Sequence, residues 1–195
     1  MKKIILIGAG NVAHHLGLSL FGAGHQIIQV ISKTQNRAKR LAEKLNTDFG
    51  TDITNIKRAD FVLIAINDDA IASVAAQIKN IPFAHTSGSV SIENAGVFYP
   101  LQTFSKNIPL DLKKVPFCIS AKDIDFENTL LEVAKSISNF VYIINKKQRK
   151  TLHLAAVFAC NFSNQMYYIA EDLLKKSDLD FLQFLHCVTW SPGPL

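Results

Sequence analysis

The sequence opens on Lys3-Ile4-Ile5-Leu6-Ile7-Gly8-Ala9-Gly10-Asn11-Val12-Ala13, and this stretch decides the fold. Aliphatic residues, mostly β-branched, run directly into a glycine pair. Apolar residues then recur at helical spacing at Leu16, Leu20 and Phe21. A strand without polar alternation is buried on both faces, which is typical of a parallel sheet covered by helices on both sides. The stretch therefore predicts strand, turn and helix at the start of an α/β fold.

The turn reads G-x-G-x-x-A, and each small residue in it has a physical reason. Gly8 permits the tight turn, Gly10 lets backbone N–H groups approach a pyrophosphate, and Ala13 lets the helix pack close to the strand. The anion would lie at the positive end of the helix that begins near Asn11. We therefore expect Gly8, Gly10, Asn11 and Val12 to surround a dinucleotide pyrophosphate. The alternative is a turn of this type that holds no cofactor.

Composition excludes several other classes of protein. With 195 residues and 48% hydrophobic content, the chain can form one full domain and a smaller second piece. No apolar run approaches the roughly 20 residues of a membrane span, so we expect a cytoplasmic protein without membrane contact. The net charge of +5 comes from scattered lysines, which argues against nucleic acid. Cys118, Cys160 and Cys187 are far apart, which predicts neither a disulfide framework nor a metal site.

The residues after the second strand, Gln26–Ile31, indicate which dinucleotide is bound. An NAD site usually has an acidic residue here, which accepts hydrogen bonds from the ribose hydroxyls. This chain instead has the hydroxyls of Ser32 and Thr34 and the cations of Lys33 and Arg37, which suit a 2′-phosphate. We therefore predict NADP(H). Alternatively, Ser32 or Thr34 caps the following helix, and the basic residues form its solvated face.

Two further strand ends carry polar residues. The buried strand 60–66 is followed by Asn67, which we expect to contact the nicotinamide half of the cofactor, and by Asp68 and Asp69, which we expect to cap the next helix. Strands near 82–85 and 96–104 bring another polar set to the same rim: His85, Thr86, Ser87, Tyr99, Gln102 and Thr103. His85 is suited to proton exchange, and a structural role fixed by backbone hydrogen bonds is equally compatible with the pattern.

A strand, a helix and a strand between 115 and 145 complete the first domain, so we predict a dinucleotide-binding domain over 1–146 and a helical domain over 147–195. The basic run 146–150 marks the boundary and is expected to be a solvated helix start. The helix 148–176 carries His153, Asn161 and Asn164 on an otherwise apolar surface. Uniform helical geometry places His153 and Asn164 on one face. Such polar groups need partners, which a cofactor and substrate or neighbouring helices would supply.

These motifs together resemble a known family. The segments 8–13, 85–89, 96–105 and 152–164 are similar to a bacterial family of NADP-dependent oxidoreductases. Its members join a Rossmann-like domain to a C-terminal helical domain of unknown function, and they are related in fold to pyrroline-5-carboxylate reductase, prephenate dehydrogenase and deazaflavin-dependent NADP oxidoreductases. The resemblance extends from Lys3 to about Leu174 and implies an NADP-binding oxidoreductase without naming a substrate.

The end of the chain departs from that family pattern. Family members continue through further helices, whereas residues 184–195 lack helical periodicity and include Ser191-Pro192-Gly193-Pro194, so the helical domain resembles a truncated product. We expect hydride transfer to a small polar carbonyl, imine or hydroxyl substrate. We also expect His153, then His85, in proton exchange, Asn161 and Asn164 on substrate polar groups, and a homodimer through the C-terminal helices. The rival hypothesis is a non-catalytic NADP-binding sensor or scaffold.

Overall fold

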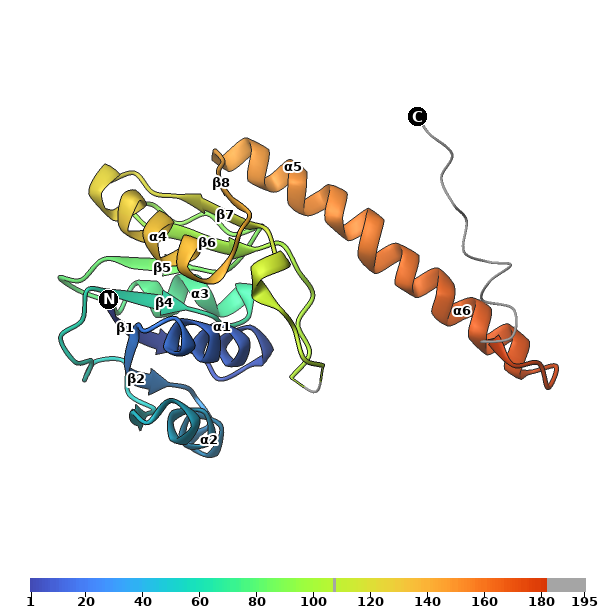
Figure 1. The fold of residues 1–195 in the computed structure, drawn as a ribbon, viewed down its shortest axis with the longest axis horizontal. Coiled ribbons are helices and arrows are strands. Elements are labelled where there is room, and N and C mark those ends of the chain that lie inside the picture. Colours follow the sequence, from blue (N-terminus) through green and yellow to red (C-terminus); the bar gives the residue numbers. More distant parts are fainter. Residues whose placement is uncertain (107, 182–195) are drawn as a thin grey trace. The chain divides into compact units, whose positions relative to one another are not determined.

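The computed structural model describes residues 1–106 and 108–181, and its chain separates into two compact units, Met1–Lys150 and Thr151–Leu195. Figure 1 shows their elements. The strands are β1 (Lys3–Ile7), β2 (Gln26–Ile31), β3 (Asp48–Gly50), β4 (Phe61–Ile64), β5 (Phe83–His85), β6 (Gly96–Pro100), β7 (Phe117–Ser120) and β8 (Val141–Ile143). The helical elements are α1 (Asn11–Gly22), α2 (Gln35–Leu45), α3 (Asp68–Ala75), η1 (Leu112–Lys114), α4 (Ile124–Ile137), α5 (Lys146–Ala156), η2 (Val157–Phe162) and α6 (Ser163–Lys175).

The strands of the first unit form one sheet in the order β3-β2-β1-β4-β5-β6-β7-β8. All neighbouring strands are parallel except β6 and β7, where Val97 faces Ser120 and Pro100 faces Phe117 in an antiparallel ladder. The chain crosses from β1–β2–β3 to β4 on the other side of β1. Such a reversal creates a crevice at the carboxyl ends of the two central strands, as in dinucleotide-binding folds. The predicted Rossmann-like α/β class is therefore confirmed.

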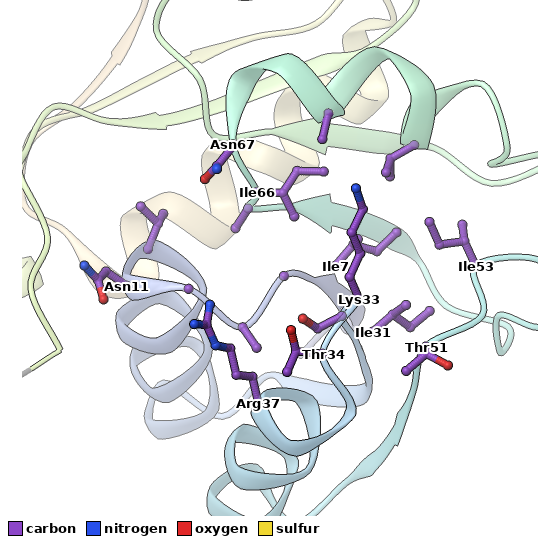
Figure 2. Close-up of a pocket in the computed structure, with 18 of the residues that line it drawn as sticks. Ile7, Asn11, Ile31, Lys33, Thr34, Arg37, Thr51, Ile53, Ile66 and Asn67 are labelled. Carbon is purple, nitrogen blue, oxygen red and sulfur yellow. The ribbon is translucent and has the colours of Figure 1, made fainter.

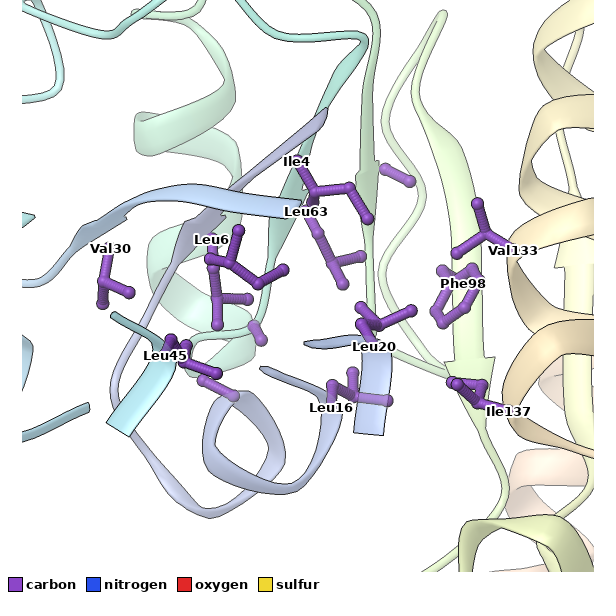
Figure 3. Packing of buried hydrophobic residues seen from close by; sticks show 14 of the residues in the cluster. Ile4, Leu6, Leu16, Leu20, Val30, Leu45, Leu63, Phe98, Val133 and Ile137 are labelled. Carbon is purple, nitrogen blue, oxygen red and sulfur yellow. The ribbon is translucent and has the colours of Figure 1, made fainter. Parts of the chain in front are cut away.

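Helices cover both faces of this sheet, and alternate residues of each strand divide between them. Ile4 and Leu6 of β1 lie in the core formed with α1, α2 and α4, where Leu16, Leu45 and Val133 are also buried (Figure 3). The intervening Ile5 and Ile7 pack with α3 on the other face. Because both faces are buried, the strands need no polar alternation, and each fully buried aliphatic side chain contributes about 1.5–3 kcal/mol.

The turn after β1 is held tightly against β4. Gly8 adopts φ +126°, and its N–H donates to the carbonyl of Ile31 at 2.7 Å. A Cβ added to Gly8 would lie 2.1 Å from the backbone oxygen of Ala65. Both the dihedral angle and this close approach require glycine. The first glycine of the motif therefore joins the ends of β1, β2 and β4.

The second unit, within its described residues, is a helical run whose hydrogen bonding changes in the middle. The sequence predicted a uniform helix, but residues Val157–Phe162 form a π-helical segment between α5 and α6. Because i→i+5 bonding turns the chain less per residue, the predicted shared face of His153 and Asn164 does not follow. None of the helices in the described part of the chain combines the length and the apolar character of a membrane span. Cys187 and the expected truncated tail lie outside the described residues.

Candidate functional site

A cavity of about 550 Å³ opens at the switch point between β1 and β4 (Figure 2). The ends of β1, β2 and β4 and the segments that follow them supply most of its wall, and the loop after β6 completes it. All nine residues that the sequence assigns to the cofactor line it, namely Gly8, Gly10, Asn11, Val12, Ser32, Lys33, Thr34, Arg37 and Asn67. The topology therefore brings together three segments that are far apart in the sequence.

The glycine turn leaves open the space that a pyrophosphate needs. Gly10 precedes α1 in an extended conformation, with φ −78°. No heavy atom of the described residues outside Gly10 and its chain neighbours lies within 4 Å of a Cβ added to it. The first N–H groups of a helix have no partner within the helix, and α1 begins directly after Gly10. The turn thus fits an anion at the start of α1.

The other end of the cavity is basic. Figure 2 shows the side chains of Lys33 and Thr34, from the segment between β2 and α2, and of Arg37, from α2, at the same end of the cavity. Thr34 occupies the N-cap position of α2, but within the described chain its side chain makes no capping hydrogen bond. Among the described lining residues there is no aspartate or glutamate. The hydroxyl is therefore available to a ligand, and the charge around it favours an anion.

The sequence placed the cap of α3 one residue too late. Asn67 occupies the N-cap position, and both Asp68 and Asp69 lie in the first turn of the helix. Asp68 instead accepts hydrogen bonds from the hydroxyls of Ser87 at 2.8 Å and Ser89 at 2.5 Å. Its carboxylate therefore fixes the loop that follows β5.

The same loop is also held by Arg149, which the sequence assigned to a solvated helix start. Arg149 is only 3% exposed. Its guanidinium donates to the carbonyls of Gly88 and Val90 at 3.2 and 2.5 Å and to the hydroxyl of Ser91 at 3.2 Å. Burial lowers the pKa of Arg149. The expectation of a solvated run is wrong at this position, because the loop carbonyls satisfy the buried cation.

His85 lies in the interior and does not line the cavity. Its Nδ1 accepts the backbone N–H of Ser87 at 3.2 Å, whereas Nε2 has no hydrogen-bond partner among the described residues. Burial, with a smaller contribution from the Arg149 cation, lowers the pKa of His85 to about 4. The ring is therefore neutral near pH 7. This environment favours the structural reading of His85 over proton exchange.

The remaining predicted residues divide between the two units. Gln102 lines the cavity, whereas Tyr99 is buried within β6 and Thr103 is exposed. Thr86 donates its hydroxyl to the carbonyl of Ile64. In the second unit, His153 lies on α5, Asn161 on the π-helical segment and Asn164 on α6, with both asparagines exposed. Their assignment to substrate stays a prediction.

Two known protein families match different parts of the chain, and the boundary between their matches lies inside the first unit. A family model described as NADP oxidoreductase, coenzyme F420-dependent, matches residues 3–93. A second, described as a domain of unknown function (DUF2520), matches residues 115–189. The first match contains the glycine turn and the basic end of the cavity, and the second contains α5 and α6.

Solved structures extend this likeness over nearly the whole chain. The crystal structure of "putative NADP oxidoreductase BF3122" from Bacteroides fragilis is 38% identical, with a TM-score of 0.87 over 96% of this chain and 77% of that one. 1-Pyrroline-5-carboxylate reductase from Streptococcus pyogenes is 17% identical, with a TM-score of 0.68 over 96% and 75%, and so shares the fold. A curated relative, glutamyl-tRNA reductase from Staphylococcus carnosus (strain TM300), is 36% identical over 76 residues, which are 39% of this chain and 16% of that protein.

Proposed function

This chain belongs to the family of NADP oxidoreductases that join a Rossmann-like domain to a DUF2520 domain, and we propose that it transfers a hydride between NADP(H) and a small polar carbonyl, imine or hydroxyl substrate. The family description also names coenzyme F420. We extend only its NADP part to this chain, because the matched residues 3–93 include the glycine turn and the basic cavity end.

The charge of the cavity lining after β2 supports NADP over NAD. Where an NAD site usually has a carboxylate for the ribose hydroxyls, the described lining of this cavity has the cations of Lys33 and Arg37 and no acidic residue. A 2′-phosphate would be attracted to this end of the cavity. Ser32 and Thr34 would donate hydroxyl hydrogen bonds to the same group.

The remaining lining residues would bind the pyrophosphate and the nicotinamide half of the cofactor. Gly8, Gly10, Asn11 and Val12 surround the pyrophosphate, and Asn67 contacts the nicotinamide half from the end of β4. When bound, NADP(H) supplies the hydride, and the protein supplies orientation and proton exchange. We place the reaction in the cytoplasm, where free thiols such as those of Cys118 and Cys160 stay reduced.

We assign proton exchange to His153 rather than to the buried His85. Asn161 and Asn164 then orient polar groups of the substrate, and a second copy of the chain pairs through the C-terminal helices. His153→Ala should lower turnover while leaving NADPH affinity nearly unchanged. Unchanged turnover would remove His153 from the mechanism.

Ser32→Asp tests the cofactor assignment. The new carboxylate would repel a 2′-phosphate and accept from ribose hydroxyls, so NADPH binding should weaken by at least about tenfold more than NADH binding. Nicotinamide fluorescence titrations measure both affinities. Asn128→Asp, on the exposed surface of α4 outside the cavity, adds the same charge as a control.

Two outcomes would contradict parts of the proposal. Equal weakening of NADPH and NADH would mean that Ser32 does not face the phosphate. A panel of carbonyl and imine substrates then tests catalysis through loss of nicotinamide absorbance. Tight NADPH binding without oxidation of the cofactor by any of them would favour the non-catalytic sensor.

A further inference from the structure

A segment distant in sequence is fastened beside the glycine turn. Three side chain-to-backbone contacts join residues 104–106 to the turn and to α1. Asn11 Nδ2 donates to the carbonyl of Phe104 at 2.9 Å, His15 Nε2 lies 2.8 Å from the carbonyl of Ser105, and Lys106 Nζ donates to the carbonyl of Ala9 at 2.7 Å. We call residues 102–106 the strap. Its partners precede it by 90 residues or more.

The strap is part of the cavity wall. Phe104 is 9% exposed and belongs to the hydrophobic core, with its ring centroid 5.5 Å from that of His15. Gln102 and Phe104 both line the cavity. The apolar anchor and the three polar contacts therefore place the Lys106 ammonium at the glycine turn.

Lys106 brings a positive charge to a turn that has none of its own. Residues 8–13 include no charged side chain, although a pyrophosphate carries negative charge. An ammonium group has three donors, and Ala9 accepts from one of them. Among the described residues Lys106 forms no ion pair within 4.0 Å, so its remaining donors can serve a ligand.

The charges that act on Lys106 are positive. Burial lowers the pKa of Lys106, and the nearby cations Arg37, Lys44 and Arg40 lower it further. The acidic residue of α2, Glu43, pairs with Lys39 at 4.0 Å, and no ion pair between Glu43 and Lys106 is formed among the described residues. Like charges held together cost free energy that a bound anion removes. The arrangement thus has the charge pattern of an anion site.

We propose that Lys106 is a phosphate-binding residue of the dinucleotide site, which the strap holds against the glycine turn. This inference rests on the proposed function. The group bound is a phosphate of NADP(H), either the pyrophosphate or the 2′-phosphate. Three parts of the chain then form the dinucleotide site: the turn after β1, the residues after β2, and Lys106.

Lys106→Met, titrated with NADPH and with NADH by nicotinamide fluorescence, tests this role. Loss of a charge-assisted hydrogen bond should weaken NADPH binding about tenfold. An equal loss for NADH identifies the pyrophosphate, whereas a loss for NADPH alone identifies the 2′-phosphate. Lys106→Arg should retain most of the affinity. Lys135→Met, an exposed lysine of α4, is the matched control.

The outcomes separate this inference from the proposed function. If the wild-type chain binds NADPH and Lys106→Met binds it within twofold of wild type, the inference is overturned and the proposed function stands. If the wild-type chain binds neither nucleotide, both are overturned. A thermal melt of each variant shows whether an affinity change reflects unfolding, and Lys106 is exposed enough for the variant to fold.

Discussion

Ser87 donates its hydroxyl to the carboxylate of Asp68 at 2.8 Å and so ties the loop after β5 to the first turn of α3. The carboxylate also accepts from Ser89, and Arg149 donates to the carbonyls of Gly88 and Val90 in the same loop. Two side chains of opposite charge, neither of them in the loop, therefore fix it at the edge of the sheet where Asn67 meets the cavity.

Asp68→Ala should lower the free energy of unfolding by about 1–3 kcal/mol, because the buried hydroxyl of Ser87 loses its acceptor. Urea denaturation measures this loss. Asp69→Ala is the control, since Asp69 is exposed in the same turn and contributes only its interaction with the helix dipole, about 0.3–1 kcal/mol. Equal losses in the two variants would show that the serine contacts add nothing.

The buried His85 predicts a pH dependence of stability. The pKa of His85 falls from 6.5 to about 4 on folding, so the unfolded chain binds the proton first as the pH drops. The contribution of His85 to the free energy of unfolding is therefore fully present above pH 6.5 and is lost as the pH falls toward 4. The slope from this group is about 1.4 kcal/mol per pH unit, or about 3 kcal/mol in all.

His85→Asn should reduce the slope between pH 6.5 and 5, where few carboxylates titrate, while its side-chain oxygen still accepts the N–H of Ser87. Part of the slope should remain, because burial also lowers the pKa values of His14 and His25. Urea denaturation at several pH values gives the slope. Cys118→Ala is a matched core truncation, since burial raises the pKa of this thiol to about 11 and it does not titrate in the window. A slope in His85→Asn identical to that of wild type would assign the effect to other groups.

Replacing the two glycines of the turn by alanine should have different effects: Gly8→Ala should lower stability, and Gly10→Ala should lower NADPH affinity. Gly8→Ala places a Cβ 2.1 Å from the Ala65 oxygen at a φ of +126°, and should cost about 3 kcal/mol or more in unfolding free energy. Gly10→Ala meets no described heavy atom within 4 Å, so the fold should persist. Its Cβ would instead obstruct the pyrophosphate and weaken NADPH binding about tenfold or more.

Urea denaturation and NADPH titration of both variants separate these effects. A stable Gly8→Ala would mean that the turn can relax away from β4. Full NADPH affinity in Gly10→Ala would mean that the nucleotide does not approach the backbone at this position.

The sequence predicted the parts of the site that are encoded locally. The apolar run 4–7, the glycine turn and the basic residues after β2 each carry a pattern within a few neighbouring positions, and the strand order then brings them together. The role of His85 stays open in the sequence, because the pattern cannot distinguish a buried neutral ring from one that exchanges protons.

Contacts that depend on the path of a loop could not be predicted in this way. Lys106 contacts Ala9 across 97 positions, and Arg149 contacts Gly88 across 61. In the sequence each is one cation among many, and Arg149 lies in a run typical of a solvated helix start. The π-helical segment Val157–Phe162 likewise has no apolar period that differs from the flanking α-helices.

The C-terminal helices carry an apolar stripe that bears on the proposed homodimer. Met166, Ile169 and Leu173 of α6 are 56%, 43% and 60% exposed, and their spacing of three and four residues places them on one side of the helix. Phe158 and Phe162 stack just before α6, with ring centroids 5.1 Å apart. A second copy of the chain would cover exposed apolar surface of this kind, so we assign the proposed homodimer contact to this stripe.

Met166→Asp should shift a dimer toward monomer, because an unpaired carboxylate in an apolar interface must be desolvated. Sedimentation velocity over a range of protein concentrations measures the shift. Tyr168→Asp is the control, since Tyr168 is 67% exposed and lies about 200° around α6 from Met166. A wild-type chain that is monomeric at every concentration, or equal dissociation by both variants, would exclude this stripe as the dimer surface.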